Sequence, residues 1–325
     1  MKVSLKLTFS VMLACLPLAS HASTAFPTEP VHIVVPFPPG GLADNLARGI
    51  ADRLTARFGQ PVLVENRPGG NTVIAAQAVA RAKPDGHTLL MATDATLSVL
   101  PLIYDKLPFD PQKDFRPVVP VAQATPFLVV SSEVPATTVD ELVKLAAEKP
   151  GHLSYGSQGQ GSNGHFSGEL LKQRAKVDIT HVPYKGLADA IGALVGNHTS
   201  MTFANVYPMI PHVESGRLRL LAYMGEERSS RYPDIPTIAE VGYPGLESVA
   251  WFGLVAPAGT PQTVADTLAS EISAIVRDPD FRERFITGAG LEPVSISTPE
   301  AFAEYLARDR QKYEERVRQT GIKIE

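Results

Sequence analysis

One junction constrains the fold most: an apolar stretch, residues 31–37, runs straight into Pro38-Pro39-Gly40-Gly41-Leu42-Ala43 and then into a helical pattern. The apolar stretch is typical of a buried β-strand. After the loop, Leu46, Ile50 and Leu54 recur every four residues, which indicates an α-helix with Asp44 and Arg48 on its wet side. Such a junction exposes backbone N–H groups at the positive end of a helix dipole, and glycines let an anion approach. The sequence therefore predicts an anion site.

Strand and helix patterns alternate along the rest of the chain. This alternation predicts α/β architecture with mostly parallel, helix-covered sheets, whose ligands lie beyond the carboxyl ends of the strands. The length favours two lobes. Two proline-rich stretches, residues 107–126 and 232–244, are interpreted as crossings between them. The expected strands are 61–65, 87–93, 127–131, 153–157, 179–184, 201–205, 218–224 and 251–256, and the expected helices are 73–82, 139–148, 165–175, 188–195 and a last one ending near residue 321.

The N-terminal segment, residues 1–22, has the pattern of a signal peptide. Lys2 and Lys6 precede an apolar run, and Ser20-His21-Ala22 fits a cleavage site, so the mature chain is expected to start at Ser23. The apolar run is too short for a membrane anchor. Lipidation at Cys15 is the minor alternative, because the residues before it form a poor lipobox.

Composition excludes several classes of function. Cys15 is the only cysteine and leaves with the signal peptide, so the mature chain has no disulfide, thiolate nucleophile or sulfur ligand for a metal. Removal of the two signal-peptide lysines leaves 28 basic and 34 acidic residues, a net charge of −6. That balance argues against nucleic acid as a partner. The histidines show no pairing at i,i+4, and no metal site is predicted.

A second glycine-rich junction lies at residues 155–165, with Gly159, Gly161 and Gly164 in a G-x-G-x-x-G pattern. A dinucleotide would also need an acidic residue at the end of the next strand, whereas Asp178 lies before that strand, so no cofactor is predicted. The hydroxyls of Ser157 and Ser162 suit a carboxylate instead.

A serine hydrolase is a weaker interpretation of the same junction. Neither serine has glycines at both −2 and +2, so the nucleophile-elbow spacing fails. His165 is near in sequence, but no group to orient it is identifiable. A lone histidine at a helix start is more typical of a cap than of a base.

Other strand ends carry polar groups. Thr93 and Asp94 end one expected strand, Ala204 and Asn205 end another, and Lys185 ends a third. Each alone is weak evidence, and a solvent-facing lysine is as good an interpretation of Lys185. Together they predict a cleft that closes between two lobes.

Several motifs are distinctive when taken together: residues 34–41 with Asp44, Ala47 and Arg48; 59–62 with 65–69; 84–90; 155–157; His181-Val182-Pro183-Tyr184-Lys185-Gly186; 236–240; and 256–261. These motifs resemble the Bug family, the extracytoplasmic solute-binding receptors of tripartite tricarboxylate transporters. The resemblance covers essentially the whole mature chain. Two segments depart from the family pattern, Asn71-Thr72 and Thr93-Asp94-Ala95-Thr96.

The resemblance implies a type II-like, two-lobe periplasmic-binding fold that closes over a small organic acid. Lobe 1 is expected at residues 23–126 plus 250–325, and lobe 2 at 127–249. A carboxylate would lie between the first strand-to-helix loop and the facing loop of the other lobe. If Asp94 points into the cleft, it would repel a second carboxylate or bind an amine. The expected ligand-binding residues are Pro39, Gly40, Gly41, Leu42, Ala43, Asp44, Thr93, Asp94, Ser157, Gln158, Gly159, Ser162, His165, Lys185, Ala204 and Asn205.

Three functions are therefore compared. The leading one is a monomeric periplasmic receptor that captures a small carboxylate and delivers it to the membrane subunits of a tripartite tricarboxylate-type transporter. A sensor subunit for a signalling partner would have the same site and differ only in the membrane protein it contacts. A secreted serine hydrolase using Ser157 or Ser162 is the third.

Overall fold

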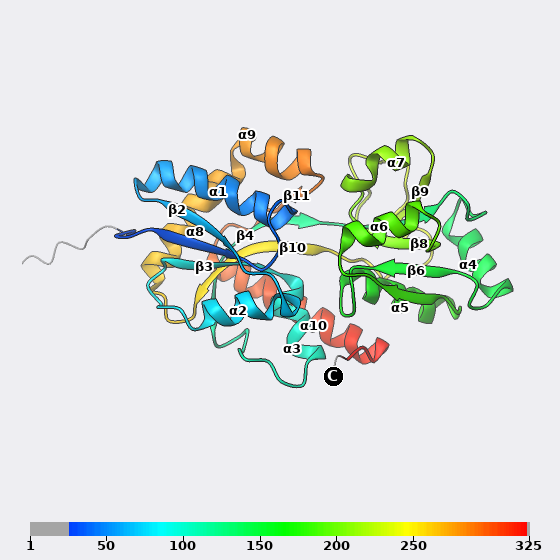
Figure 1. Ribbon diagram of the computed structural model, residues 1–325, viewed down its shortest axis with the longest axis horizontal. Helices are drawn as coiled ribbons and strands as arrows, with labels where there is room; N and C mark the ends of the chain where they lie inside the picture. Colours follow the sequence, from blue (N-terminus) through cyan, green and yellow to red (C-terminus); the bar gives the residue numbers. More distant parts are fainter. Residues whose placement is uncertain (1–25, 324–325) are drawn as a thin grey trace, which may run out of the picture.

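The computed structural model describes residues 26–323, so the predicted signal peptide and Ser23 lie outside the described residues. Two β-sheets, each flanked by helices, lie side by side (Figure 1). The first has six strands in the order β11-β4-β10-β3-β1-β2, and the second has five in the order β7-β6-β8-β5-β9. Within residues 26–323, no helix has both the length and the apolar character needed to cross a bilayer.

The first sheet is covered by helices on both faces. α1 (Leu42–Phe58) and α8 (Gln262–Arg277) pack on one face, and α2 (Val73–Ala80) and α10 (Pro299–Thr320) pack on the other. Apolar residues from these helices and from the strands form two buried clusters, which hold this half of the molecule together. The strands are β1 (Val31–Val35), β2 (Val62–Asn66), β3 (Thr88–Thr93), β4 (Phe115–Ala124), β10 (Ala250–Pro257) and β11 (Glu292–Pro293).

The second sheet is built in the same way. α4 (Val139–Glu148) and α5 (Asn163–Ala175) cover one face, and α6 (Leu187–Val195) and α7 (Ile210–Glu214) cover the other. The strands are β5 (Phe127–Ser131), β6 (Ser154–Ser157), β7 (Thr180–Pro183), β8 (Met201–Ala204) and β9 (Leu218–Tyr223). Short helical segments complete the described chain: η1 (Gly70–Thr72), η2 (Ala95–Val99), α3 (Leu100–Ile103), η3 (Tyr207–Met209), α9 (Pro279–Phe281), η4 (Arg282–Ile286) and η5 (Thr287–Ala289).

The two-lobe α/β architecture is as predicted, but the sheets are mixed rather than mostly parallel. β1 pairs in parallel with β2 and β3, and β6 pairs in parallel with β7 and β8. The other pairings are antiparallel. The cause is the path of the chain: β4 leads to the second sheet and β10 leads back, so these two neighbours run in opposite directions.

β4 is a strand that the sequence prediction missed, because its prolines suggest a crossing. Pro117 and Pro120 lie opposite Val255 and Gly253, beside the two register shifts of the β4–β10 ladder. A bulge leaves a residue out of the ladder, and it therefore tolerates a proline, which has no N–H to donate. The crossing itself is the two residues that follow the strand, Thr125 and Pro126.

The second crossing also differs from its predicted position. The proline-rich stretch 232–244 packs on the second sheet, where Ile238 and the nearby Leu246 are buried in its core. Tyr223 donates its N–H to Pro236 O, which ties the stretch to β9. The chain returns to the first sheet only after these contacts, through residues 247–249.

Candidate ligand-binding site

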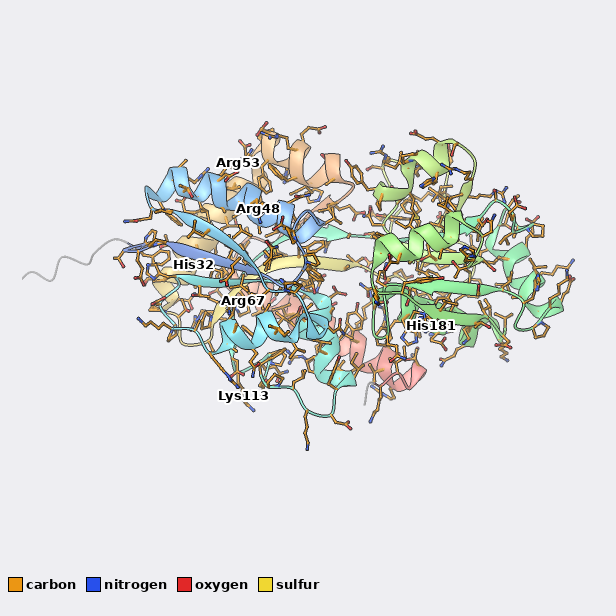
Figure 2. All side chains as sticks on the ribbon, viewed as in Figure 1. His32, Arg48, Arg53, Arg67, Lys113 and His181 are labelled. Atoms are coloured by element: carbon orange, nitrogen blue, oxygen red, sulfur yellow. The ribbon has the colours of Figure 1, made fainter. Side chains whose placement is uncertain are left out.

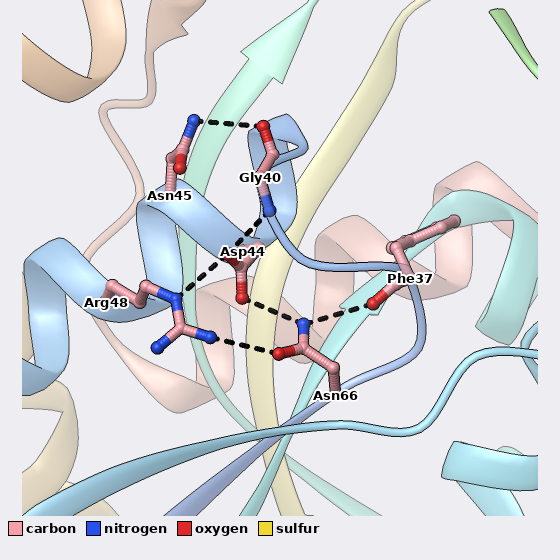
Figure 3. A network of polar contacts seen from close by, with 6 residues as sticks. All are labelled: Phe37, Gly40, Asp44, Asn45, Arg48 and Asn66. Atoms are coloured by element: carbon pink, nitrogen blue, oxygen red, sulfur yellow. Dashed lines mark hydrogen bonds and ion pairs between the residues drawn. The ribbon is translucent and has the colours of Figure 1, made fainter.

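The loop between β1 and α1 is held by the carboxylate of Asp44, which is 2 % exposed (Figure 3). Its Oδ2 accepts hydrogen bonds from Gly40 N–H and Arg48 Nε–H, each at 2.9 Å. Its Oδ1 accepts one from Asn66 Nδ2 at 2.8 Å. Burial acts to raise the pKa of Asp44, but these hydrogen bonds outweigh it and the pKa lies below the usual value. Asp44 is therefore an ionised anchor for the loop.

This network corrects the predicted exposure of Asp44, while the ligand contacts of Asp44 and Gly40 stay predictions. Asp44 is expected on the wet side of the helix and among the ligand contacts, whereas its carboxylate is buried and occupied by protein donors. The Gly40 N–H is likewise donated to Asp44 and is not free for an anion. Pro39 is exposed at the loop and has no N–H to offer.

The N-terminus of α1 remains open for an anion. Gly41 is the N-cap residue, and no side chain caps the helix. The first N–H groups of a helix have no intrahelical acceptor, so those of Leu42 and Ala43 stay available. With the helix dipole, this end of α1 has the properties of an anion site.

The second glycine-rich loop is held by two serines whose hydroxyls face the protein. Ser157 is fully buried, and its Oγ accepts the Gly159 N–H at 3.2 Å and lies 2.7 Å from His181 Nε2. Ser162 caps α5, because its Oγ accepts the His165 N–H at 3.3 Å while donating to Gly159 O at 2.7 Å. The Ser157 hydroxyl therefore positions the loop, and its direct contact with a ligand stays a prediction.

Three stacked aromatic rings lie next to this loop and contact it through His165. The rings of His165 and His181 lie 4.0 Å apart and almost parallel, and Tyr155 stacks on the other face of His181 at 4.8 Å. His165 Nδ1 accepts the Gly161 N–H at 3.1 Å, so this predicted ligand residue also serves the loop. His181, labelled in Figure 2, was not among the predicted site residues.

The Ser157–His181 contact bears on the hydrolase interpretation. Burial and the neighbouring His165 lower the pKa of His181 to about 4, so it would be a weak general base at neutral pH. The fully buried hydroxyl of Ser157 also offers no surface to a substrate. The pair has the distance of a catalytic dyad but neither the access nor the basicity.

Asp94 is buried between the two sheets rather than directed at a ligand. Its Oδ2 accepts hydrogen bonds from Asn163 Nδ2 at 2.7 Å and from Tyr313 Oη at 2.8 Å. The neighbouring Thr93 is also buried, and its hydroxyl contacts that of Thr96 at 3.2 Å. The sequence leaves open whether Asp94 faces the cleft, and in the structure its Oδ2 is occupied by Asn163 and Tyr313.

The other residues predicted to bind the ligand in the second lobe occupy different environments. Lys185 is exposed and has no hydrogen bond or ion pair with any residue between 26 and 323. Ala204 packs in the apolar core of the second sheet. Asn205 donates from Nδ2 to Gly290 O at 2.8 Å, so its amide serves a contact between the lobes. Gln158 is half-buried in the second loop.

The two loops lie at facing edges of the two sheets. β1 and β3 are parallel neighbours, so their carboxyl ends share one edge of the first sheet, and that edge faces the second sheet (Figure 1). Asp94 follows β3, and its contact with Asn163 brings the start of α5 to this edge. The second loop immediately precedes Asn163. The α1 N-terminus and the second loop therefore lie at the edges of the two sheets that face each other.

A separate cavity of about 810 Å³ lies beside the chain crossing at Thr125. It is lined from both lobes by Thr125, Asn205, Tyr223 and Glu292, among others, and not by either loop. Its acidic and basic side chains are equal in number, four of each, and so favour no charge class of ligand. We distinguish it from the loop site as the rear cavity.

One carboxylate–histidine cluster resembles a metal site. Ligand atoms of Glu29, Asp85 and His87 lie within 4.8 Å of one another. However, His87 Nε2 accepts the Thr28 N–H at 3.2 Å, so in the neutral ring Nδ1 carries the proton and lies 3.2 Å from Asp85 Oδ1. That nitrogen then has no lone pair for a metal, and the arrangement is explained by the contact with Asp85.

Comparison with known proteins places the chain in a family. Residues 46–321 match the model of the tripartite tricarboxylate transporter family receptor, TctC. BugT of Bordetella pertussis is 33 % identical over 307 residues, which are 94 % of each chain.

Two solved structures at similar identity share the fold. Rpa4515 of R. palustris, solved with adipate, has a TM-score of 0.83 at 34 % identity and covers 92 % of this chain and 99 % of its own. MatC (Rpa3494) from Rhodopseudomonas palustris, solved with bound malate, has a TM-score of 0.79 at 31 % identity and covers 90 % of this chain and 100 % of its own. The predicted resemblance to the Bug receptors is thus confirmed, and the chain belongs to the tripartite tricarboxylate transporter receptor family, TctC, a family of solute-binding receptors and not of enzymes.

Proposed function

We propose that this receptor captures a small organic acid between its two loops and delivers it to the membrane subunits of a tripartite tricarboxylate-type transporter. The observation that carries the proposal is the pair of helix N-termini, α1 from the first lobe and α5 from the second, at facing sheet edges. Each offers backbone N–H groups and the positive end of a dipole to a carboxylate. Adipate and malate, the acids bound in two relatives, are the natural first probes.

The ligand contacts that we propose are narrower than those expected from the sequence. The N–H groups of Gly41, Leu42 and Ala43 would hold the carboxylate from the first lobe. The second loop, from Gln158 to Ser162, would hold it from the other side. Asp44, Ser157 and the three stacked rings would affect ligand binding indirectly, because they hold the two loops in place.

The lobes themselves are proposed as the moving units. Lobe 1 would comprise residues 23–126 plus 250–325, and lobe 2 residues 127–249, because the chain crosses between the sheets near 125–126 and 247–249. Closure over the acid would exclude water and strengthen the dipole contacts. The receptor would act as a monomer.

Periplasmic location is part of the same proposal. Intact-mass measurement of protein recovered from the periplasm should give a chain that begins at Ser23, because residues 20–22 form the cleavage site. A chain that retains residues 1–22, or one that carries lipid on Cys15, would contradict this.

The binding site is tested by Gly41→Val. The Gly41 φ of −82° is allowed for valine, and a Cβ there would meet only Pro38 O at 3.9 Å, so the variant should fold. Its side chain would block the approach of an anion to the helix N–H groups. Loss of a hydrogen bond to a charged group costs about 1.5–3 kcal/mol, so calorimetry with adipate and malate should show binding at least about 10-fold weaker.

Gly192→Val is the control for this test. Gly192 is exposed within α6, and nothing lies within 4 Å of the position that an added Cβ would take. The control should bind each acid as the wild type does. Wild-type affinity of Gly41→Val for an acid that the wild type binds would place the carboxylate elsewhere.

A further inference from the structure

A buried polar cluster joins the two lobes at one side of the candidate site. Asp94 follows β3 in the first lobe, Asn163 begins α5 in the second, and Tyr313 lies in the second half of α10. Asp94 Oδ2 accepts from Asn163 Nδ2 at 2.7 Å and from Tyr313 Oη at 2.8 Å. Tyr313 also contacts Asn163 Oδ1, which closes a triangle of three side chains. Asp94 is 4 % and Tyr313 is 1 % exposed, so water does not compete for these bonds.

Apolar packing surrounds this triangle and extends the contact between α5 and α10. Phe166, one turn into α5, is fully buried and packs edge-on against the Tyr313 ring with centroids 5.7 Å apart. Phe166 belongs to a buried cluster made mainly of first-lobe residues. Further along the same pair of helices, Gln173 Nε2 donates to Gln319 O at 2.8 Å. The beginning of α5 is therefore anchored in the first lobe, although the helix covers the second sheet.

We propose that Asp94, Asn163 and Tyr313 form an interlobe pivot that fixes the start of α5 against the first lobe and thereby positions the second binding loop. The two chain crossings alone would leave the lobes free to rotate about them. Like the Asn205–Gly290 hydrogen bond, the pivot is a non-covalent contact between the lobes, and it lies beside the loop that ends at Ser162. Its three members are positioning residues, because their polar groups are occupied by one another rather than by a ligand. Its effect on ligand binding rests on the proposed function, while its effect on lobe orientation does not.

The pivot carries a titratable group in the acid range. Burial and the nearby Asp309 raise the pKa of Asp94 to about 6, while the hydrogen bonds from Tyr313 and Asn163 act in the opposite direction. Tyr305 also interacts with Asp94, and Arg316 interacts with Tyr313, while Lys312 interacts with Asp309; all three are on α10. The pKa of Asp94 is higher in the formed pivot than in a solvated carboxyl, so proton uptake favours the formed pivot. The pivot is therefore tighter below about pH 6 and looser above it.

Lobe orientation can be measured directly in this chain. Without residues 1–22 it has no cysteine, so spin labels can be placed at introduced cysteines, Asn45→Cys on α1 and Asp189→Cys on α6. Both positions are exposed. In the ligand-free chain, Tyr313→Phe and Asn163→Ala should broaden the distribution of label-to-label distances at pH 7.5. Tyr305→Phe is the matched control: its hydroxyl is on the same helix and bonds to Gln123 of β4, within the first lobe, so the distribution should stay narrow.

The dependence of the distance distribution on pH distinguishes a pivot from a merely structural role of these three residues. In the wild type the distribution should narrow as the pH falls from 7.5 to 5, and Asp94→Asn should remove this dependence. His165 and His181 titrate in the same chain, but they remain in both proteins and cancel in the comparison. Two results would overturn the pivot. One is a distance distribution that is equally narrow in the wild type, Tyr313→Phe and Asn163→Ala. The other is a pH dependence that persists in Asp94→Asn.

Ligand binding gives the second readout. For folded variants, as checked by circular dichroism, adipate or malate affinity should fall about 10-fold in Tyr313→Phe, since one hydrogen bond to a charged group is lost. It should be unchanged in Tyr305→Phe. If no acid binds even the wild type, the proposed function fails while the distance measurement still decides the pivot. Unchanged affinity in Tyr313→Phe, with binding intact in the wild type, would show that the pivot does not position the loop.

Discussion

Replacing Asp44 with alanine is expected to lower the free energy of unfolding by about 3 kcal/mol or more and to abolish most acid binding. The change leaves three donors, on Gly40, Arg48 and Asn66, without their acceptor. A hydrogen bond to a charged group contributes about 1.5–3 kcal/mol, although Arg48 is half-exposed and can turn to water, so its share is small. Urea unfolding at pH 7 measures the stability, and calorimetry with adipate and malate measures the binding.

Asp52→Ala is the matched control, because it removes the same group from an exposed position on the same helix. Its unfolding free energy should lie within about 0.5 kcal/mol of the wild type, as is usual for surface substitutions. If Asp44→Ala and Asp52→Ala were equally stable, Asp44 would not be the anchor of the loop.

Gly168→Ala is expected to destabilise the protein by about 2 kcal/mol, although alanine normally favours a helix over glycine by roughly 0.5–1 kcal/mol. Gly168 lies in α5 against the ring of Tyr155, and a Cβ would come within 2.3 Å of Tyr155 Cε2. Tyr155 is fully buried, so its ring cannot move aside without cost, and overpacking of this kind typically costs about 1–3 kcal/mol.

Gly192→Ala gives the opposite expectation for the same chemical change. Gly192 is in α6 and has nothing within 4 Å of the added Cβ, so this variant should gain about 0.5–1 kcal/mol. Thermal unfolding of the pair compares the two directly. A Gly168→Ala protein as stable as Gly192→Ala would mean that α5 does not press on the Tyr155 ring.

The strand-to-helix junctions could be predicted from the sequence because their signals are local. The apolar run of β1, the glycines after it and the four-residue spacing of α1 lie within one segment, and the structure has all three. β6 and α5 follow the same logic. Because the two loops follow β1 and β6, their position at the carboxyl ends of these strands could also be predicted.

The roles of single polar side chains could not be predicted in the same way. Asp44 precedes Arg48 by one helical turn, which suggests an exposed ion pair, and only Asn66 from the neighbouring strand and the Gly40 turn explain why it is buried. Asp94 and Tyr313 are 219 residues apart in sequence, and nothing near either residue indicates the other. His181 lies within a quoted motif, but its stacking on His165 depends on the pairing of β6 with β7.

The proline-rich stretches show the same limit for backbone structure. A proline within an apolar run usually argues against a strand. In β4 the argument fails, because the two prolines fall beside irregularities of the ladder that depend on β10, a strand far along the chain. The mixed sheets have the same origin: strand direction is set by where the chain returns, which no local pattern records.

The central claim is that a carboxylate lies between the α1 N-terminus and the second loop, and glycine amides report on both. With ¹⁵N-glycine labelling of the chain without residues 1–22, titration with adipate and malate should shift the amide signals of Gly41 and Gly161. Both signals should follow one saturation curve, because a single ligand would touch both loops. Gly225 and Gly290 line the rear cavity, so their signals should shift less than those of Gly41 and Gly161. Shifts confined to Gly225 and Gly290, with Gly41 and Gly161 unmoved, would contradict the account.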